Sequence, residues 1–211
     1  MTPPMPQSVS PATPPGPPEV SPLQIIRTET VLSRLPIHTL AKTGTVAIHI
    51  RRTNAQGDVT LAWTVSPNPA YGVPRQLAYK LDTLVINQRV DQLGRPLPRL
   101  LRLGSLTALC ATLGSHKQEV KRALYQNATT AIAARVQYRG QDGTPHCLEA
   151  VFTRYSVLWT GQRLPDGTCA DAVYLVLSEP YWEVLNTAPV RPLNYAYLTA
   201  LTPAAQRFYE L

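Results

Sequence analysis

The chain has 211 residues, of which 44% are hydrophobic and 16% are charged, and its net charge is +7. This length suits one ordinary domain with a core and excludes a large multidomain assembly. We expect a cytoplasmic protein with no membrane span and no signal peptide, because no apolar run approaches about 18 residues and the N-terminus lacks a charged segment followed by an apolar one. The cysteines Cys110, Cys147 and Cys169 are widely spaced, so we expect free thiols, no metal and no cofactor.

Proline is concentrated at the N-terminus. Nine of the 21 prolines lie within residues 1–22, among Ser, Thr and Gln and without any aromatic residue. Such a composition cannot build a core. We therefore predict a disordered proline-rich tail over residues 1–30 and a folded domain over residues 31–211.

The basic residues are concentrated in one third of the chain. Residues 75–139 hold eleven Lys or Arg and three acids, whereas the remaining residues hold nine bases and ten acids. A local excess of this kind releases condensed counterions when it lies against a phosphate backbone, so it favours nucleic-acid binding. A solvated face that only keeps the protein soluble is the alternative.

The fold is predicted to open with a β-hairpin, followed by a helix. Two β-branched-rich runs, 45–52 and 58–66, flank the turn residues 54–57. Pro74 suits the first position of a helix, and Leu77, Leu81, Leu84 and Val85 then form one apolar stripe.

A helix-turn-helix is predicted next. Ser105 can cap a helix over 106–113, Gly114 suits the turn, and Ser115 can cap a second helix from 116 to about 133. Val120, Leu124, Ala128 and Ala131 give this second helix a buried stripe. On or beside its opposite face lie Lys117, Gln118, Lys121, Arg122 and Tyr125.

Strands are predicted directly after the second helix, over 135–139, 147–159 and 171–177, with turns at 140–143 and 165–167. A recognition helix followed by a hairpin is the order of a winged helix, in which the helix enters the major groove and the hairpin lies along the backbone. We thus predict an α+β fold, a winged helix-turn-helix with an N-terminal β-hairpin. Trp63 and Trp159 are interpreted as core residues. The candidate DNA-binding residues are Ser115, His116, Lys117, Gln118, Lys121, Arg122, Tyr125 and Arg139.

Two helical segments are predicted to close the chain, a short one over 179–185 and another opened by Pro192 and Asn194. In the final segment Ala204, Phe208 and Leu211 form an apolar stripe that the core or a partner must cover. We expect a homodimer in which this stripe, with the opening hairpin, pairs with a second copy.

The ordered motifs resemble the plasmid replication initiators of the replication initiator protein A type over roughly residues 44–211. The matching segments are TGTVAI at 43–48, SPNPAYGVPRQLAYKLDTL at 66–84, LGSLTALCATLG at 103–114, KRALYQNATTAIAARVQY at 121–138 and PLNYAYLTALTPAAQRFYEL at 192–211. The resemblance implies a winged-helix protein that binds repeated double-stranded DNA sites at an origin, helps to open the duplex and recruits host replication proteins. Related initiators often carry two such modules, so a chain ending at Leu211 implies a single-module member or a piece of a longer initiator.

Signatures of catalysis are absent from the sequence. There is no phosphate-binding G-x-x-x-x-G-K-[ST] loop, no G-x-S-x-G and no H-E-x-x-H, so we expect a protein that is not an enzyme. A winged-helix transcriptional repressor would have the same residue pattern as an initiator. A dimerisation module that does not bind DNA is the third possibility.

Overall fold

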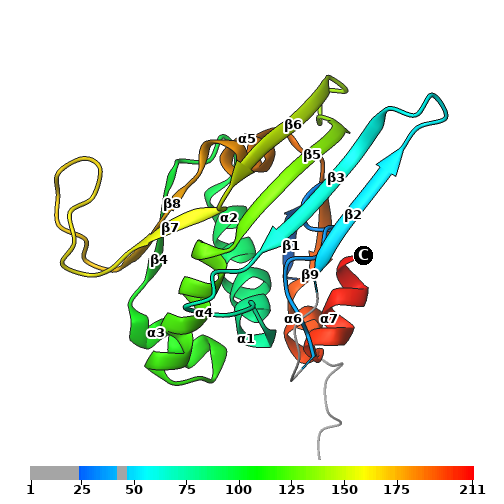
Figure 1. Cartoon of the computed structure of the whole chain (residues 1–211). Coiled ribbons are helices and arrows are strands. Elements are labelled where there is room, and N and C mark those ends of the chain that lie inside the picture. Colours follow the sequence, from blue (N-terminus) through cyan, green and yellow to red (C-terminus); the bar gives the residue numbers. More distant parts are fainter. Residues whose placement is uncertain (1–23, 42–46) are drawn as a thin grey trace, which may run out of the picture.

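The computed structural model describes residues 24–41 and 47–211, and these form a mixed α+β fold (Figure 1). The strands are β1 (Ile25–Glu29), β2 (Ile48–Thr53), β3 (Val59–Ser66), β4 (Leu100–Gly104), β5 (Ala131–Arg139), β6 (Pro145–Phe152), β7 (Tyr155–Leu158), β8 (Val173–Leu177) and β9 (Val190–Asn194). The helices are α1 (Gln76–Lys80), the π-helix η1 (Leu81–Ile86), α2 (Asn87–Leu93), α3 (Leu106–Leu113), α4 (Lys117–Thr129), α5 (Glu179–Thr187), α6 (Tyr195–Ala200) and α7 (Pro203–Glu210). No helix within the described ranges is long and apolar enough to cross a membrane.

The largest sheet is antiparallel, with the strand order β2-β3-β5-β6. Its central strand β5 alternates strictly, so that Ile132, Ala134 and Val136 are buried while Arg135 and Gln137 are exposed. This period of two places the apolar side chains on the face that packs against the helices. The predicted hairpin is confirmed as β2 and β3, although its predicted start at Thr45 lies outside the described residues.

A second, three-stranded sheet has the order β4-β8-β7. The predicted single strand over 147–159 is wrong, because β6 ends at Phe152 and β7 begins at Tyr155. The two strands pair with different partners, β6 with β5 and β7 with β8. The break also places the Arg154 side chain in the interior, where it is 5% exposed.

A buried carboxylate on η1 receives this arginine. Asp82 Oδ2 lies 2.5 Å from Arg154 Nη1 and 3.1 Å from His38 Nε2. Asn127 Nδ2 donates to Asp82 Oδ1 at 3.0 Å and to the Ala78 carbonyl at 2.9 Å. Because Asn127 belongs to α4, this network holds α4 against the consecutive helices α1 and η1. A buried charge is costly in free energy unless it is paired and hydrogen-bonded, as Asp82 is here.

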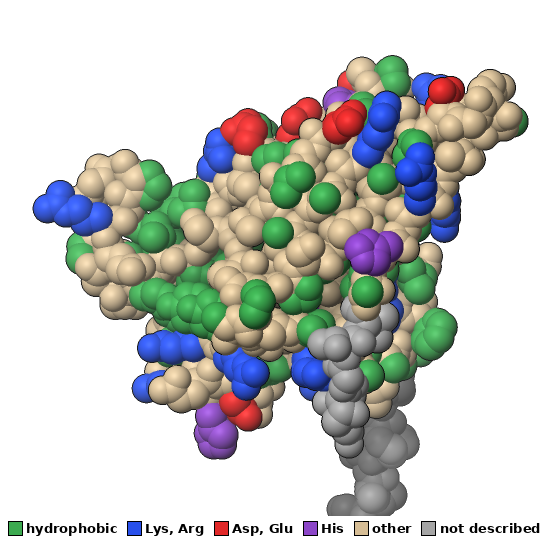
Figure 2. Space-filling model, viewed as in Figure 1, with side chains coloured by type: hydrophobic (Ala, Val, Ile, Leu, Met, Phe, Trp, Pro, Cys, Tyr) green, Lys and Arg blue, Asp and Glu red, His purple; other side chains and the backbone are tan. Residues whose placement is uncertain are grey.

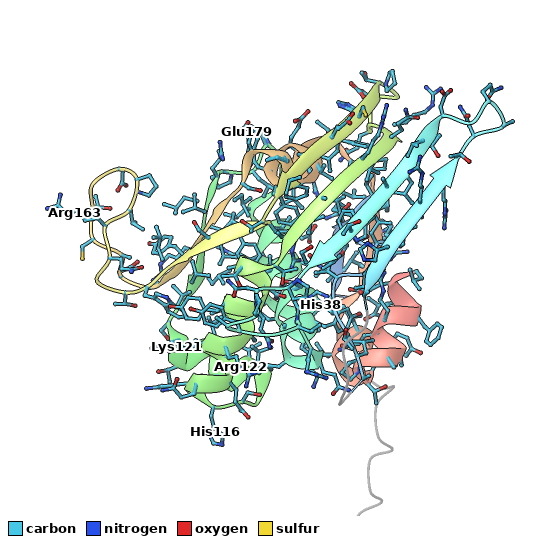
Figure 3. All side chains as sticks on the ribbon, in the orientation of Figure 1. His38, His116, Lys121, Arg122, Arg163 and Glu179 are labelled. Atoms are coloured by element: carbon cyan, nitrogen blue, oxygen red, sulfur yellow. The ribbon has the colours of Figure 1, made fainter. Side chains whose placement is uncertain are left out.

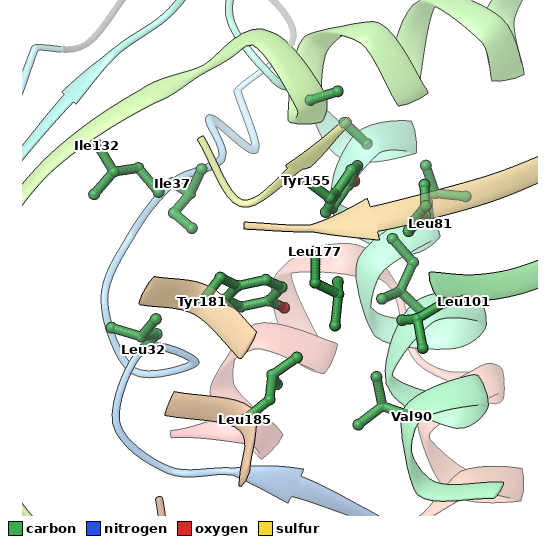
Figure 4. Packing of buried hydrophobic residues seen from close by; sticks show 14 of the residues in the cluster. Leu32, Ile37, Leu81, Val90, Leu101, Ile132, Tyr155, Leu177, Tyr181 and Leu185 are labelled. Atoms are coloured by element: carbon green, nitrogen blue, oxygen red, sulfur yellow. The ribbon is translucent and has the colours of Figure 1, made fainter. Parts of the chain in front are cut away.

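One apolar core joins the four-stranded and three-stranded sheets to the helices from α1 to α5 (Figure 4). A second, smaller cluster of Ile26, Leu84, Leu193 and Leu198 packs β1 and β9 against η1 and α6. Leu81, Leu101 and Leu177 are fully buried in the larger core, and Tyr155 and Tyr181 lie among them. Trp63 on β3 is 1% exposed, and its indole N–H donates to the Pro36 carbonyl at 2.9 Å, which confirms its prediction as a core residue. The four-stranded sheet is thereby attached to the segment before β2.

The predicted boundary of the tail at residue 30 is wrong. Residues 25–29 form β1, which pairs antiparallel with β9 at the other end of the chain. Ile26 is buried, and the buried Glu29 carboxylate accepts backbone hydrogen bonds from Val31, Leu32 and Ser33 at 2.6–2.8 Å. The pairing of β1 with β9 is long-range and therefore left no local pattern in the sequence, whereas the Glu29 hydrogen bonds join residues two to four positions apart. The rest of the predicted tail, residues 1–23, lies outside the described residues.

Helix α4 is shorter than predicted. It ends at Thr129, and residues 131–133 belong to β5 instead. The hydroxyls of Thr129 and Thr130 donate to the carbonyls four residues earlier, at 2.7 and 2.6 Å. From Ala131 the backbone groups pair with β3, and this long-range pairing overrides the local preference of the alanines for a helix.

Candidate nucleic-acid interface

The predicted pair of helices around Gly114 is confirmed as α3 and α4. Ser105 caps α3 by accepting from the Ala108 N–H at 3.1 Å, and Gly114 has a φ of +61°, a left-handed conformation that favours glycine. The predicted N-cap Ser115 is wrong. The cap is His116, whose backbone N–H donates to the Glu119 carboxylate at 3.0 Å.

The exposed face of α4 carries the predicted cations. Lys117, Gln118 and Arg122 are exposed and Lys121 is half-buried, whereas Val120 and Leu124 are fully buried. His116 projects from the end of the helix, away from the body of the molecule (Figure 3). The amphipathic prediction is therefore confirmed for this helix, and its polar face is open to a partner.

Tyr125 lies in an aromatic cluster on this helix rather than pointing freely outward. Its ring stacks on Tyr71 with centroids 4.9 Å apart, and its hydroxyl accepts from the Trp159 indole N–H at 2.9 Å. The Lys121 ammonium sits 5.3 Å from the centre of the Trp159 ring. Trp159, predicted as a core residue, packs against the core but is only half-buried, at the rim of the cationic face. Sequence reasoning missed Tyr71 and Trp159 since they come from distant loops.

A loop between β7 and β8, residues 159–172, projects beside α4 (Figure 3). It is held by backbone hydrogen bonds from Gly161 to Ala170, from Ala170 to Gln162 and from Leu164 to Thr168, at 2.8–2.9 Å. Arg163 lies on this projecting loop and is exposed. The loop thus places one cation away from the body of the protein, on the side of α4 where Trp159 lies.

Arg139 does not share this surface. It is the last residue of β5, which runs away from α4, and at about 3.3 Å per residue the nine-residue strand carries it about 26 Å from the helix end. Its guanidinium donates to the Gly143 carbonyl in the β5–β6 turn. The structure brings together the α4 residues of the predicted site and separates Arg139 from them.

The basic third of the chain is not one surface either. Arg99 pairs with Glu179, Arg102 pairs with Asp171 at 2.8 Å, and Arg135 lies 3.6 Å from Glu149. In Figure 2, Lys and Arg side chains lie at the α3–α4 end and also at the opposite end over the four-stranded sheet, where most of the visible Asp and Glu side chains lie as well. Among the described residues, Lys117, Lys121 and Arg122 have no carboxylate within salt-bridge distance.

Comparison with known proteins returned no matching family model, no matching curated protein and no matching solved structure.

Proposed function

We propose that this protein binds double-stranded DNA, with α4 in the major groove and the β7–β8 loop along the backbone. The observation that carries the proposal is the polar face of α4, which holds Lys117, Lys121 and Arg122 without a carboxylate of the described residues within salt-bridge distance. A face of this kind gains free energy from counterion release against phosphates. Glu119, an acid on the same helix, caps the N-terminus of α4 by accepting from the His116 N–H.

The arrangement of elements supports a winged helix as the finer description of this module. β4 precedes the helix pair, and it pairs with β8, the second strand of the projecting hairpin. This pairing fixes the hairpin against the helices, as a wing must be fixed if both elements are to contact one duplex. The β5–β6 hairpin directly after α4, which the sequence suggested as a wing, belongs to the large sheet instead.

The resemblance to plasmid replication initiators makes repeated sites at a replication origin the duplex to test first. In this proposal the protein is not an enzyme, and host replication proteins are its further partners. A transcriptional repressor with the same module would differ in the location of its sites. Footprinting the purified protein on plasmid origin DNA and on its own promoter separates these two roles.

The central test is a salt titration of binding to a random duplex. The wild-type protein should show a steep fall of log affinity with log salt, and the double substitution Lys121→Ala, Arg122→Ala should flatten that slope by up to about two units, one for each lost phosphate contact. Circular dichroism should show an unchanged fold, because neither side chain belongs to the core. A double variant with wild-type affinity and slope would leave α4 as a solvated face and would favour the dimerisation module.

A further inference from the structure

The loop between β3 and α1 forms a hollow of about 400 Å³ beside α4. Its lining combines apolar with polar and cationic residues: Pro67, Asn68, Pro69, Gly72, Val73, Arg75, Arg122 and Gln126. Two of the lining residues, Arg122 and Gln126, come from α4. The hollow is therefore continuous with the cationic face of that helix.

The loop that shapes this hollow is well ordered by its own hydrogen bonds. Asn68 Oδ1 accepts from the Ala70 N–H at 2.9 Å, and the Asn68 carbonyl accepts from Tyr71 and Gly72 at 3.2 and 2.8 Å. Gln126 Nε2 donates to the Tyr71 carbonyl at 3.0 Å, which ties the loop to α4. The hollow is thus a built feature whose shape does not depend on a ligand.

The charge of the hollow selects an anion. Among the described residues, Arg75 and Arg122 line it and no Asp or Glu does, and Arg75 Nη1 also donates to the Ala41 carbonyl at 2.9 Å. The exposed Arg122 guanidinium makes no hydrogen bond or ion pair with the described residues, so its donors are available to a ligand. Guanidinium groups bind phosphate through paired, charge-assisted hydrogen bonds.

The hollow lies on the other flank of α4 from the wing. Lys121 lies against Trp159 at the base of the β7–β8 loop, whereas Arg122 and Gln126 line the hollow beside the β3–α1 loop. Tyr125 lies between the two flanks and contacts both loops, through Trp159 and Tyr71. The major groove of DNA is about 12 Å wide and is bordered by one phosphate backbone on each side. A helix that lies in the groove therefore has a backbone beside each flank. The two flanks of α4 would then face the two strands of one duplex.

Building on the proposed function, we propose that the hollow between the β3–α1 loop and Arg122 is a phosphate-binding site for the DNA strand opposite the one that the wing contacts. The β3–α1 loop becomes a third DNA-contacting element, which no helix-turn-helix pattern in the sequence indicated. It would set the direction in which the duplex crosses α4.

Two substitutions of opposite charge test this site. Asn68→Asp keeps the oxygen that accepts from the Ala70 N–H and adds a carboxylate to the hollow. It should weaken binding to a random duplex and flatten the salt slope by about 0.9, the value for one phosphate. Pro69→Lys, at an exposed position on the same rim, should strengthen binding and steepen the slope by a similar amount. A merely disruptive change would weaken binding in both variants.

Matched controls are Gln56→Glu and Gln56→Lys, at the exposed tip of the β2–β3 hairpin, which should leave the slope unchanged. If Lys121→Ala flattens the slope while both hollow variants match wild type, the phosphate site is wrong and the proposed function stands. If wild type shows no salt-dependent binding, the proposed function fails as well. Opposite shifts in the two hollow variants, absent in both controls, would support the site.

Discussion

Glu210 is a polar residue that is buried on the inward side of α7, whereas the apolar Phe208 of the same helix is exposed. Glu210 lies near the end of α7, is 3% exposed, and its carboxylate accepts from the Tyr79 hydroxyl at 2.6 Å. Gln206, one turn earlier, is also buried and donates to the Leu198 carbonyl at 2.9 Å. The inward face of α7 therefore includes polar side chains held by hydrogen bonds, while Tyr209 of the same helix packs against a small apolar cluster around Leu198.

Burial raises the pKa of the Glu210 carboxyl above its ordinary value, although the Tyr79 hydroxyl and Arg207 partly oppose this. A carboxyl with a raised pKa holds its proton in the folded state at pH values where the unfolded chain has released it. Its contribution to stability is therefore full below the unfolded pKa of about 4.3 and is lost as the pH rises through the folded value.

We expect Glu210→Gln to reduce this loss of stability, because the amide cannot ionise and can still accept from Tyr79. Between pH 4 and pH 8 the free energy of unfolding of wild type should fall relative to the variant, by about 1.4 kcal/mol for each unit by which the pKa is raised. Urea denaturation across this range measures the difference. Parallel curves would contradict the prediction, and the exposed Glu183→Gln on α5 controls for the loss of one negative charge.

At the scale of elements, the β7–β8 loop is an ordered projection with its own backbone hydrogen bonds, and Arg163 is its only cation. The strands below it pair from Tyr155–Leu177 to Leu158–Tyr174. The loop is therefore separable from the strand pairing that holds the hairpin in the fold.

Replacing residues 162–170 by Asn-Gly should leave the fold intact, because this dipeptide suits a two-residue hairpin turn. Duplex affinity should fall and the salt slope should flatten by about 0.9, the value for the phosphate contact of Arg163. Fluorescence anisotropy at several salt concentrations measures both quantities.

Arg163→Ala should reproduce the change in slope, whereas Arg139→Ala, at the far end of β5, should not. If Arg163→Ala and Arg139→Ala change the salt slope equally, the slope reports only the net charge of the protein. That outcome would contradict a DNA contact by the β7–β8 loop.

At the scale of the whole molecule, α7 presents an apolar surface to solvent. Phe208 is 81% exposed and Leu211 is 58% exposed, and Tyr197 on the neighbouring α6 is 53% exposed. The stripe predicted from the sequence therefore exists, but the core of this chain does not cover it. Apolar side chains gathered on a surface in this way are typical of interaction sites.

We expect the protein to form a homodimer through this surface, and Phe208→Glu to shift it toward the monomer. Burying a charged carboxylate in an apolar contact is costly, while at an exposed position in the monomer it should not disturb folding. Sedimentation velocity at micromolar concentration measures the equilibrium.

Val151→Glu, at a side chain 78% exposed on β6, controls for an added charge on an apolar position elsewhere. A wild-type monomer at these concentrations, or a dimer that only Val151→Glu disrupts, would rule out the α7 surface.

The sequence alone determined the features that depend on neighbours along the chain. Helices α3 and α4 were predicted from the period of their apolar residues, the Ser105 cap and the turn at Gly114. The β2–β3 hairpin was predicted from the two β-branched-rich runs that flank residues 54–57. The cationic face of α4 followed from the same periodicity, because side chains three and four residues apart share a face of a helix.

Only the tertiary structure decided the features that join distant residues. β1 exists because β9 pairs with it, and α4 ends at Thr129 because β5 pairs with β3. Tyr71, which precedes Tyr125 in the chain, and Trp159, which follows it, both contact the Tyr125 side chain. Arg139 lies far from this cluster because it is the last residue of β5. Local patterns cannot encode such contacts, since the free energy that selects them comes from pairing and burial between segments far apart in the chain.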